Sequence, residues 1–181
     1  PISIRSSLSN KLISSLEFDL TSAQSRCINQ INEDLSTSEP MLRLLQGDVG
    51  SGKTIVAVFA LIQVAENNFQ TAVMAPTEIL ARQHLQNFTN YLSPLGIQIA
   101  FLSGSQNTQE RKDNLSLIEN GEAKVIIGTH ALFQENVYFD DLALVIIDEQ
   151  HKFGVHQRLS LSKKANVTPH QLVMTATPIP R

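Results

Sequence analysis

Short apolar runs alternate with amphipathic segments along most of this chain. Val, Ile, Leu and Ala dominate these runs, and stretches of helical periodicity separate them. We expect strands over 71–75, 97–102, 123–128, 142–147 and 171–175. Strands that are apolar on both faces and separated by helices are typical of a parallel sheet covered on both sides. The pattern therefore predicts an α/β fold with a central, mostly parallel sheet flanked by helices.

The helices follow from the same periodicity. We expect helices over 78–92 and 107–119, a short one near 129–133, and another that Thr21 caps and that runs to about Leu35. In the segment 78–92, the side chains expected to share a core-facing side are Ile79, Leu80, Leu85 and Phe88. Cys27 falls at helical spacing between Ala23 and Ile31, so we expect a buried thiol.

Length and composition describe one ordinary globular domain. The chain has 181 residues, of which 42% are hydrophobic and 17% charged. No apolar stretch reaches the roughly 18 residues that a membrane span needs, and no signal-peptide pattern is present. Pro1 in place of Met indicates an excised fragment. We expect a cytoplasmic protein, with 1–15 a linker or helix from a preceding domain and 16–181 the domain itself.

The net charge gives no sign of a nucleic-acid partner. It is −3, whereas a strongly basic surface would have favoured such a partner. Backbone amides and hydroxyl groups also hold phosphates, so this observation lowers that expectation without removing it.

The run GDVGSGKT, residues 47–54, fits the phosphate-binding loop pattern G-x-x-x-x-G-K-S/T at every fixed position. An apolar run precedes it at 41–45 and another follows at 55–61, which is the strand, loop and helix context that the motif needs. Such a loop wraps a polyphosphate in backbone N–H groups at a helix N-terminus. Lys53 should reach the β and γ phosphates, and the Thr54 hydroxyl should bind Mg²⁺. The chain is therefore expected to bind a nucleoside triphosphate.

An acidic motif follows the apolar run 144–147. Asp148 and Glu149 would lie at the carboxyl edge of the sheet, beside the phosphate-binding loop. Asp148 is suited to hold Mg²⁺ and Glu149 to deprotonate the attacking water. Gln150 and His151 complete the motif, and a zinc role for His151 is unsupported because one Cys and five His show no ligand spacing.

The series Phe18-x-x-Thr21-x-x-Gln24 has two interpretations. Gln24 carries a donor and an acceptor on one amide, which suits the N6 and N7 edge of adenine. Thr21 and Gln24 also have the spacing of a helix capping box, which spacing alone favours.

Three loops at expected strand ends combine small or hydroxyl residues with a helix start. They are 75–78, 103–105 and 128–131. This chemistry suits contacts to nucleic-acid phosphates, and it equally suits plain helix caps, which we favour from the residues alone. Thr175 and Thr177 end the last strand, where they could contact the acidic motif, although position alone indicates only a strand end and a Pro-rich turn.

Taken in order, the motifs GDVGSGKT, APTEILARQH, GTHAL, DEQH and TATPIPR resemble the first motor domain of superfamily 2 helicases. FDLTSAQ and VIIGTHALFQENVYF are further similar to the RecG family of bacterial DNA helicases, and the resemblance covers about 18–181. The transcription-repair coupling factor is similar, but its acidic motif usually reads DEEH. The resemblance implies a three-layer, RecA-like P-loop NTPase domain that uses ATP and Mg²⁺ to move on branched DNA.

The resemblance also implies a role for each matching position. The positions that would bind the triphosphate, its adenine or its metal ion are Phe18, Gln24, Gly47, Asp48, Val49, Gly50, Ser51, Gly52, Lys53, Thr54 and Asp148. Glu149 would be the catalytic base. Those along the DNA are Pro76, Thr77, Arg82, Ser103, Gly104, Thr129 and His130. Thr175 and Thr177, with Gln150 and His151, would couple hydrolysis to movement.

The family pattern implies partners as well. A whole member has an N-terminal wedge domain and a second RecA-like domain, which supplies arginine fingers, and it acts as a monomer. A fragment without them should bind nucleotide weakly and hydrolyse it very slowly, because an arginine finger typically contributes about 10³–10⁵ in rate.

Two other functions are open on the residues alone. A small-molecule kinase would need a lid and an acceptor pocket, and it would leave TATP without a role. A nucleotide-gated DNA-binding module would need no catalytic base. The intact Glu149 argues against it for the parent protein, while truncation leaves it open for the fragment.

Overall fold

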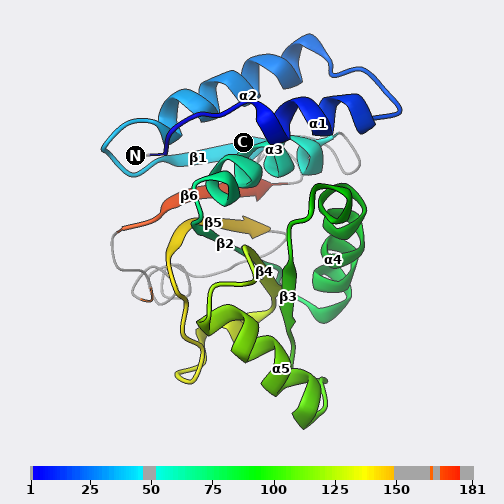
Figure 1. Ribbon diagram of the computed structural model, residues 1–181, viewed down its shortest axis with the longest axis vertical. Coiled ribbons are helices and arrows are strands. Elements are labelled where there is room, and N and C mark those ends of the chain that lie inside the picture. The colour runs from blue at the N-terminus through cyan, green and yellow to red at the C-terminus, as the bar shows by residue number, and fades with distance from the viewer. Residues whose placement is uncertain (1, 47–51, 149–163, 165–167, 176–181) are drawn as a thin grey trace, which may run out of the picture.

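Six parallel strands form the centre of the molecule (Figure 1). The computed structural model describes residues 2–46, 52–148, 164 and 168–175. The strands are β1 (Leu42–Gln46), β2 (Gln70–Met74), β3 (Ile99–Leu102), β4 (Val125–Gly128), β5 (Leu142–Asp148) and β6 (His170–Thr175). Their order across the sheet is β1-β6-β5-β2-β4-β3, and each neighbouring pair is parallel.

Helices cover both faces of this sheet. They are α1 (Ser7–Ser15), α2 (Ser22–Leu35), α3 (Lys53–Glu66), α4 (Glu78–Leu92) and α5 (Thr108–Glu119), with short 3-10 turns at Ser93–Leu95 and His130–Phe133. One apolar core lies between the sheet and α1 to α4, and a second lies between the opposite face and α5. The prediction of a three-layer α/β fold with a parallel sheet is confirmed.

The direction of each crossover explains this division. The connections from β1 to β2 and from β2 to β3 run the same way across the sheet, and their helices α3 and α4 share one face. The connection from β3 back to β4 runs the other way, and α5 lies on the other face. Right-handed crossovers require this arrangement. It places every strand-to-helix turn at the carboxyl edge of the sheet.

The N-terminal segment packs on α3 (Figure 1). Gln63 of α3 accepts a hydrogen bond from Arg5 N and donates one to Arg5 O, both at 2.8 Å, and Glu66 accepts one from Leu8 N at 3.0 Å. Ile2 and Leu12 are buried in the same core as the helix. Residues 2–15 therefore pack on this domain. That they form a linker or helix from a preceding domain stays a prediction.

The burial expected for Ile79 and for Cys27 was wrong, and β1 is exposed at two of its leucines. In β1, Leu42 and Leu44 are 73% and 58% exposed, because β1 is an outermost strand of the sheet and only its Leu45 joins the core. Ile79 is 72% exposed, since the buried stripe of α4 runs through Ala81, His84, Phe88 and Leu92 instead. Cys27 is only partly buried, although burial still raises the pKa of its thiol.

None of the helices in the described ranges has the length and apolar character of a membrane span.

Candidate nucleotide and DNA site

The start of α3 lies beyond the carboxyl end of β1. Gly52 is the N-cap residue of this helix, and its left-handed backbone, with φ at 90°, is one that glycine adopts without strain. Lys53 and Thr54 form the first turn, where backbone N–H groups point out of the helix and favour an anion. Of the predicted phosphate-binding loop, Gly52, Lys53 and Thr54 are described.

Lys53 reaches from this turn to the neighbouring strand. Its Nζ donates a hydrogen bond of 2.7 Å to the carbonyl oxygen of Thr175, the last residue of β6. The Thr175 hydroxyl oxygen is buried and has no hydrogen-bond partner among the described residues. The structure thus joins the predicted phosphate-binding lysine to the first of the two predicted coupling threonines.

Asp148 ends β5, one strand further along. It pairs in register with Met174, the residue before Thr175, so Asp148 and the carbonyl that Lys53 contacts lie at the same edge, one residue apart in register. The Asp148 side chain is only 6% exposed, and its Oδ2 lies 2.6 Å from His84 Nε2 of α4. At this distance a proton lies between the two atoms, so the imidazole donates and the carboxylate accepts.

A cavity of about 420 Å³ opens beside the first turn of α3. Its walls come from the segment before α2, from α2 itself, from α3 and from α4. The lining residues are Phe18, Asp19, Thr21, Gln24, Gly52, Thr54, Ile55, Asn87 and Tyr91. An aromatic ring, a side-chain amide and a helix N-terminus therefore face one space large enough for part of a nucleotide.

Gln24 serves the helix cap and also faces this cavity. Its Oε1 accepts from Thr21 N at 2.9 Å, and Thr21 Oγ1 accepts from Gln24 N at 3.0 Å, so the capping box that spacing favoured is confirmed. Its Nε2 packs against Gly52, where a Cβ atom would overlap it. Since Oε1 has a second lone pair and Nε2 has no hydrogen bond to a described residue, the cap leaves the amide able to read a base.

The predicted DNA-contacting loops lie at the carboxyl ends of β2, β4 and β3, the other half of the same edge. Thr77 caps α4 by accepting from Leu80 N at 3.2 Å, and Thr129 caps the turn at His130–Phe133 by accepting from Ala131 N at 3.4 Å. Two of the three favoured caps are thus confirmed, and the one expected within 103–105 is wrong, because Asn107 caps α5 by accepting from Glu110 N at 2.8 Å. Ser103 is buried, whereas Gly104 and His130 are exposed and Pro76 is partly so.

Arg82 is engaged within this half of the edge. Its Nε donates to Glu78 Oε2 at 3.1 Å, and its guanidinium lies over the Phe101 ring, 5.0 Å from the centroid. Ser105 Oγ also donates to Glu78, and these two bonds, that of Ser105 foremost, lower the pKa of the Glu78 carboxyl. A phosphate that approached Arg82 would therefore meet a carboxylate beside it.

Nine of the predicted site residues lie outside the described ranges. They are Gly47, Asp48, Val49, Gly50, Ser51, Glu149, Gln150, His151 and Thr177. Their roles stay predictions.

Sequence reasoning missed three residues of α4 that face the nucleotide half of the edge. His84 contacts Asp148, while Asn87 and Tyr91 line the cavity. They follow each other at intervals of three and four, which places them on one side of a helix. The signal was present in the spacing, but a polar histidine was not counted as part of the buried stripe.

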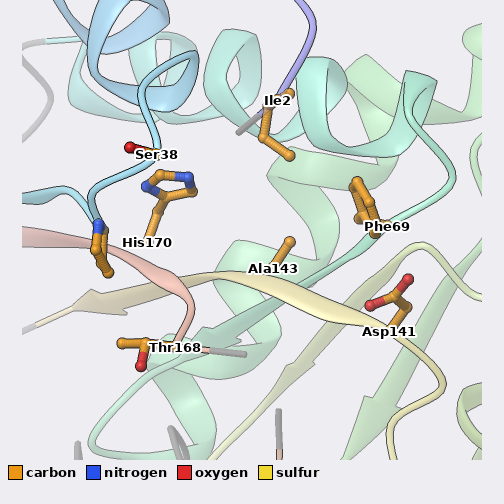
Figure 2. A pocket seen from close by; sticks show the side chains of 8 residues that line it. Ile2, Ser38, Phe69, Asp141, Ala143, Thr168 and His170 are labelled. Atoms are coloured by element: carbon orange, nitrogen blue, oxygen red, sulfur yellow. The ribbon is translucent and has the colours of Figure 1, made fainter. Parts of the chain in front are cut away.

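Another cavity, of about 430 Å³, lies at the opposite edge, where the strands begin (Figure 2). Phe69, Asp141, Ala143 and His170 surround it together with Ile2, and none of the predicted site residues takes part. Within the described residues, no group of three or more His, Cys, Asp or Glu side chains is arranged to hold a metal ion. The predicted chemistry and this second cavity are therefore separated by the length of the strands.

Comparison with known proteins agrees with this geometry. The family model of the DEAD/DEAH box helicases matches residues 21–181. The chain belongs to this family. Its sequence is 52% identical to that of the ATP-dependent DNA helicase RecG of Escherichia coli K12. The corresponding identities are 51% for RecG of Haemophilus influenzae and 48% for RecG of Treponema pallidum.

The chain covers only part of these relatives. The alignments include 99–100% of this chain but 27% of each of the three RecG proteins. Among solved structures, RecG bound to a three-way DNA junction matches with a TM-score of 0.87 and 46% identity over 100% of this chain and 24% of that one. The DUF1998 helicase MrfA matches with a TM-score of 0.68 at 18% identity over 99% of this chain and 30% of its own, which shows a shared fold. The resemblance to RecG that the motifs predicted is confirmed.

Proposed function

We propose that this chain is the ATP-binding motor domain of a helicase that couples ATP hydrolysis to movement on branched DNA, such as replication forks and Holliday junctions. One observation carries the proposal: Lys53 and Asp148 meet at one sheet edge, while the candidate DNA loops occupy the other half of that edge. The RecG relatives named as ATP-dependent DNA helicases, and the RecG structure with a three-way junction, support it.

The nucleotide would lie across the first turn of α3. Its phosphates would accept hydrogen bonds from the amides of this turn and from Lys53, and its base would enter the cavity beside Phe18 and Gln24. Lys53 Nζ now donates to Thr175 O, so a bound γ-phosphate would draw the lysine away from the end of β6. This exchange gives β6 a direct way to sense the nucleotide.

The donor set at this edge suits Mg²⁺. The ion prefers oxygen ligands, and the Thr54 hydroxyl and the Asp148 carboxylate are the described groups that would hold it. When bound, the ion would neutralise charge on the β and γ phosphates. Asp148 is kept in place by His84 from behind, so its carboxylate orientation is fixed before the nucleotide arrives.

Hydrolysis would use the residue that follows Asp148 in the chain. We assign the role of base for the attacking water to Glu149, and the roles of coupling residues to Gln150, His151, Thr175 and Thr177. Thr175 supports this assignment because its backbone carbonyl holds Lys53 and its buried hydroxyl has no described partner.

The DNA backbone would follow the carboxyl ends of β2, β4 and β3. Pro76, Thr77, Ser103, Gly104 and Thr129 offer backbone and hydroxyl contacts there, and Arg82 and His130 add basic side chains. Contacts of this kind hold phosphates without a strongly basic surface, which agrees with the net charge of −3.

Other parts of a whole helicase would complete the motor. We propose a second RecA-like domain that supplies an arginine to the nucleotide, a wedge domain that engages the branch, and a monomer that works in the bacterial cytoplasm. The isolated chain should then bind nucleotide weakly and hydrolyse it slowly, since an arginine finger contributes about 10³–10⁵ in rate.

Two variants of the full-length protein test the proposal. Lys53→Ala should weaken ATP binding and abolish unwinding of a forked duplex. Glu149→Gln should keep ATP bound, measured with a fluorescent ATP analogue, while it stops turnover. Normal hydrolysis by Glu149→Gln would disprove the base assignment, and phosphate transfer from ATP to a small acceptor would indicate a kinase instead.

A further inference from the structure

His84 and Asp148 form a buried polar contact between α4 and the end of β5. Nε2 and Oδ2 are 2.6 Å apart, and the two side chains are 11% and 6% exposed. The residues are 64 positions apart in sequence, so the contact exists only in the folded domain. A charge-assisted hydrogen bond of this length fixes the orientation of the carboxylate that accepts it.

The histidine ring has no second polar anchor. Its Nδ1 is buried without a hydrogen-bond partner among the described residues. The ring instead stacks on Phe88, one turn further along α4, with centroids 5.7 Å apart and planes at 23°. A buried polar atom that the fold leaves unsatisfied calls for an explanation other than packing. The other ring nitrogen accounts for the burial of this histidine, since Nε2, which contacts Asp148, is the only ring atom with a polar contact among the described residues.

The position of His84 on α4 connects the two halves of the carboxyl edge. This helix begins after Thr77, among the candidate DNA contacts, and His84 lies about two turns along it. The next turns carry Asn87 and Tyr91, which line the nucleotide cavity. A single rigid helix therefore contacts the DNA half of the edge, the magnesium carboxylate and the nucleotide cavity.

We infer that His84 is a positioning residue that holds Asp148 for Mg–ATP and transmits the position of α4, and so the presence of DNA, to that carboxylate. This inference rests on the proposed function. His84 does not contact substrate itself: its effect passes through the orientation of one carboxylate. Partners of this kind, which orient a metal-binding side chain, typically change metal affinity or activity by about 10–100-fold when they are removed.

Three variants of the full-length protein test the inference. His84→Met keeps the volume and loses the donor, and His84→Gln keeps an N–H donor at similar reach. Gln86→Ala, at an exposed position of the same helix, is the matched control. For each variant, binding of a fluorescent ATP analogue is measured as Mg²⁺ is varied, and ATP hydrolysis is measured with and without a forked DNA duplex.

We expect His84→Met to need about 10-fold more Mg²⁺ for half-maximal nucleotide binding, with binding in EDTA unchanged. The stimulation of hydrolysis by DNA should fall by a similar factor, and His84→Gln should restore most of both. Unchanged Mg²⁺ dependence in His84→Met would overturn the positioning role. An unchanged ratio of DNA-stimulated to basal rates would overturn the transmission through α4.

A measurement on the wild-type protein covers the case in which His84→Met fails to fold. In ¹⁵N-histidine NMR spectra of the full-length protein, His84 should carry its proton on Nε2, and its signal should shift when Mg²⁺ and the ATP analogue are added. A proton on Nδ1 alone, or a signal that ignores the metal, would overturn the inference. Wild-type protein that binds no Mg–ATP would instead disprove the proposed function.

Discussion

Buried histidines lie both where the strands of this sheet begin and where they end, and they have different roles. At the edge where strands begin, His170 Nδ1 accepts from Met41 N at 2.8 Å and joins the starts of β6 and β1. At the edge where strands end, His84 gives its one described bond to Asp148 and leaves Nδ1 without a partner. The first histidine is used up by backbone hydrogen bonding, and the second holds a side chain of the candidate site.

Both polar atoms of the Gln70 side-chain amide are hydrogen-bonded at the first edge, although the hydroxyl of the neighbouring Thr71 is buried without a partner among the described residues. Gln70 Nε2 donates to Ile118 O at 3.0 Å and to Ala123 O at 2.9 Å, and its Oε1 accepts from Asp141 N at 3.0 Å. The side chain is fully buried. Gln70 and His170 therefore stabilise the fold at this edge, whereas His84 and Asp148 belong to the candidate ligand site at the other.

Gln70→Leu should have the largest effect on stability. It would leave Ala123 O and Asp141 N without their described partners, while Ile118 O would keep the hydrogen bond from Gly121 N. At about 1–3 kcal/mol for each unsatisfied group, we expect a loss of roughly 3 kcal/mol after relaxation. Urea unfolding measures the loss. The control Gln109→Leu, on the exposed face of α5, should change the free energy of unfolding by less than about 0.5 kcal/mol. A Gln70→Leu protein that keeps its stability but loses nucleotide binding would contradict this division of roles between the edges.

Gly52→Ala should affect both stability and nucleotide binding. Its left-handed backbone costs an alanine about 1–2 kcal/mol, and the new Cβ would displace the Gln24 amide from the cavity. Gly96→Ala is the matched control, because its φ is 75° and nothing lies within 4 Å of the Cβ position. Both variants should be destabilised to a similar extent in thermal unfolding, but only Gly52→Ala should bind the ATP analogue more weakly. Equal affinities would show that Gln24 does not contact the base.

His170 should make stability depend on pH. Burial lowers the pKa of this imidazole below its ordinary value of 6.5 in the folded chain. Below pH 6.5 the unfolded chain therefore binds more protons, and the free energy of unfolding falls as the pH is lowered towards the folded pKa. His170→Asn keeps an acceptor for Met41 N and does not titrate, so its stability should fall less between pH 7.5 and 5.5. Parallel curves for the two proteins would contradict this prediction.

Glu78→Gln should have the smallest effect, at the carboxyl edge. The change removes the carboxylate that accepts from Arg82 and Ser105, and it makes the guanidinium more available to a phosphate. We expect forked DNA to bind roughly twofold to fivefold tighter at low salt, measured by fluorescence anisotropy. Weaker binding would mean that Glu78 positions Arg82 for the DNA.

Local sequence determined most elements, because hydrophobic periodicity and capping chemistry act over a few residues. The structure places α4 at Glu78–Leu92, the range that the sequence predicted, and Thr21 caps α2 as its spacing with Gln24 indicated. The face that α4 buries was less predictable. His84 is polar by type, yet it is buried because its Nε2 forms a hydrogen bond with Asp148, 64 positions away. No local pattern contains that contact.

The site was predictable only as far as its motifs. The loop GDVGSGKT and Asp148 could be recognised from their residue types and from their positions directly after apolar runs. Asn87 and Tyr91 form no motif, and they reach the nucleotide cavity because α4 packs beside α3. The exposure of Leu42 and Leu44 depends in the same way on strand order, which places β1 at the edge of the sheet.

We propose that Lys53 and Asp148 serve one Mg–ATP. A crystal structure of the full-length protein with Mg²⁺ and a non-hydrolysable ATP analogue tests it most directly. We predict a single ion bound by the Thr54 hydroxyl and within one water of Asp148, with Lys53 released from Thr175 O onto the γ-phosphate. An ion or triphosphate that contacts neither Thr54 nor Asp148, or a lysine that stays on Thr175, would contradict the account.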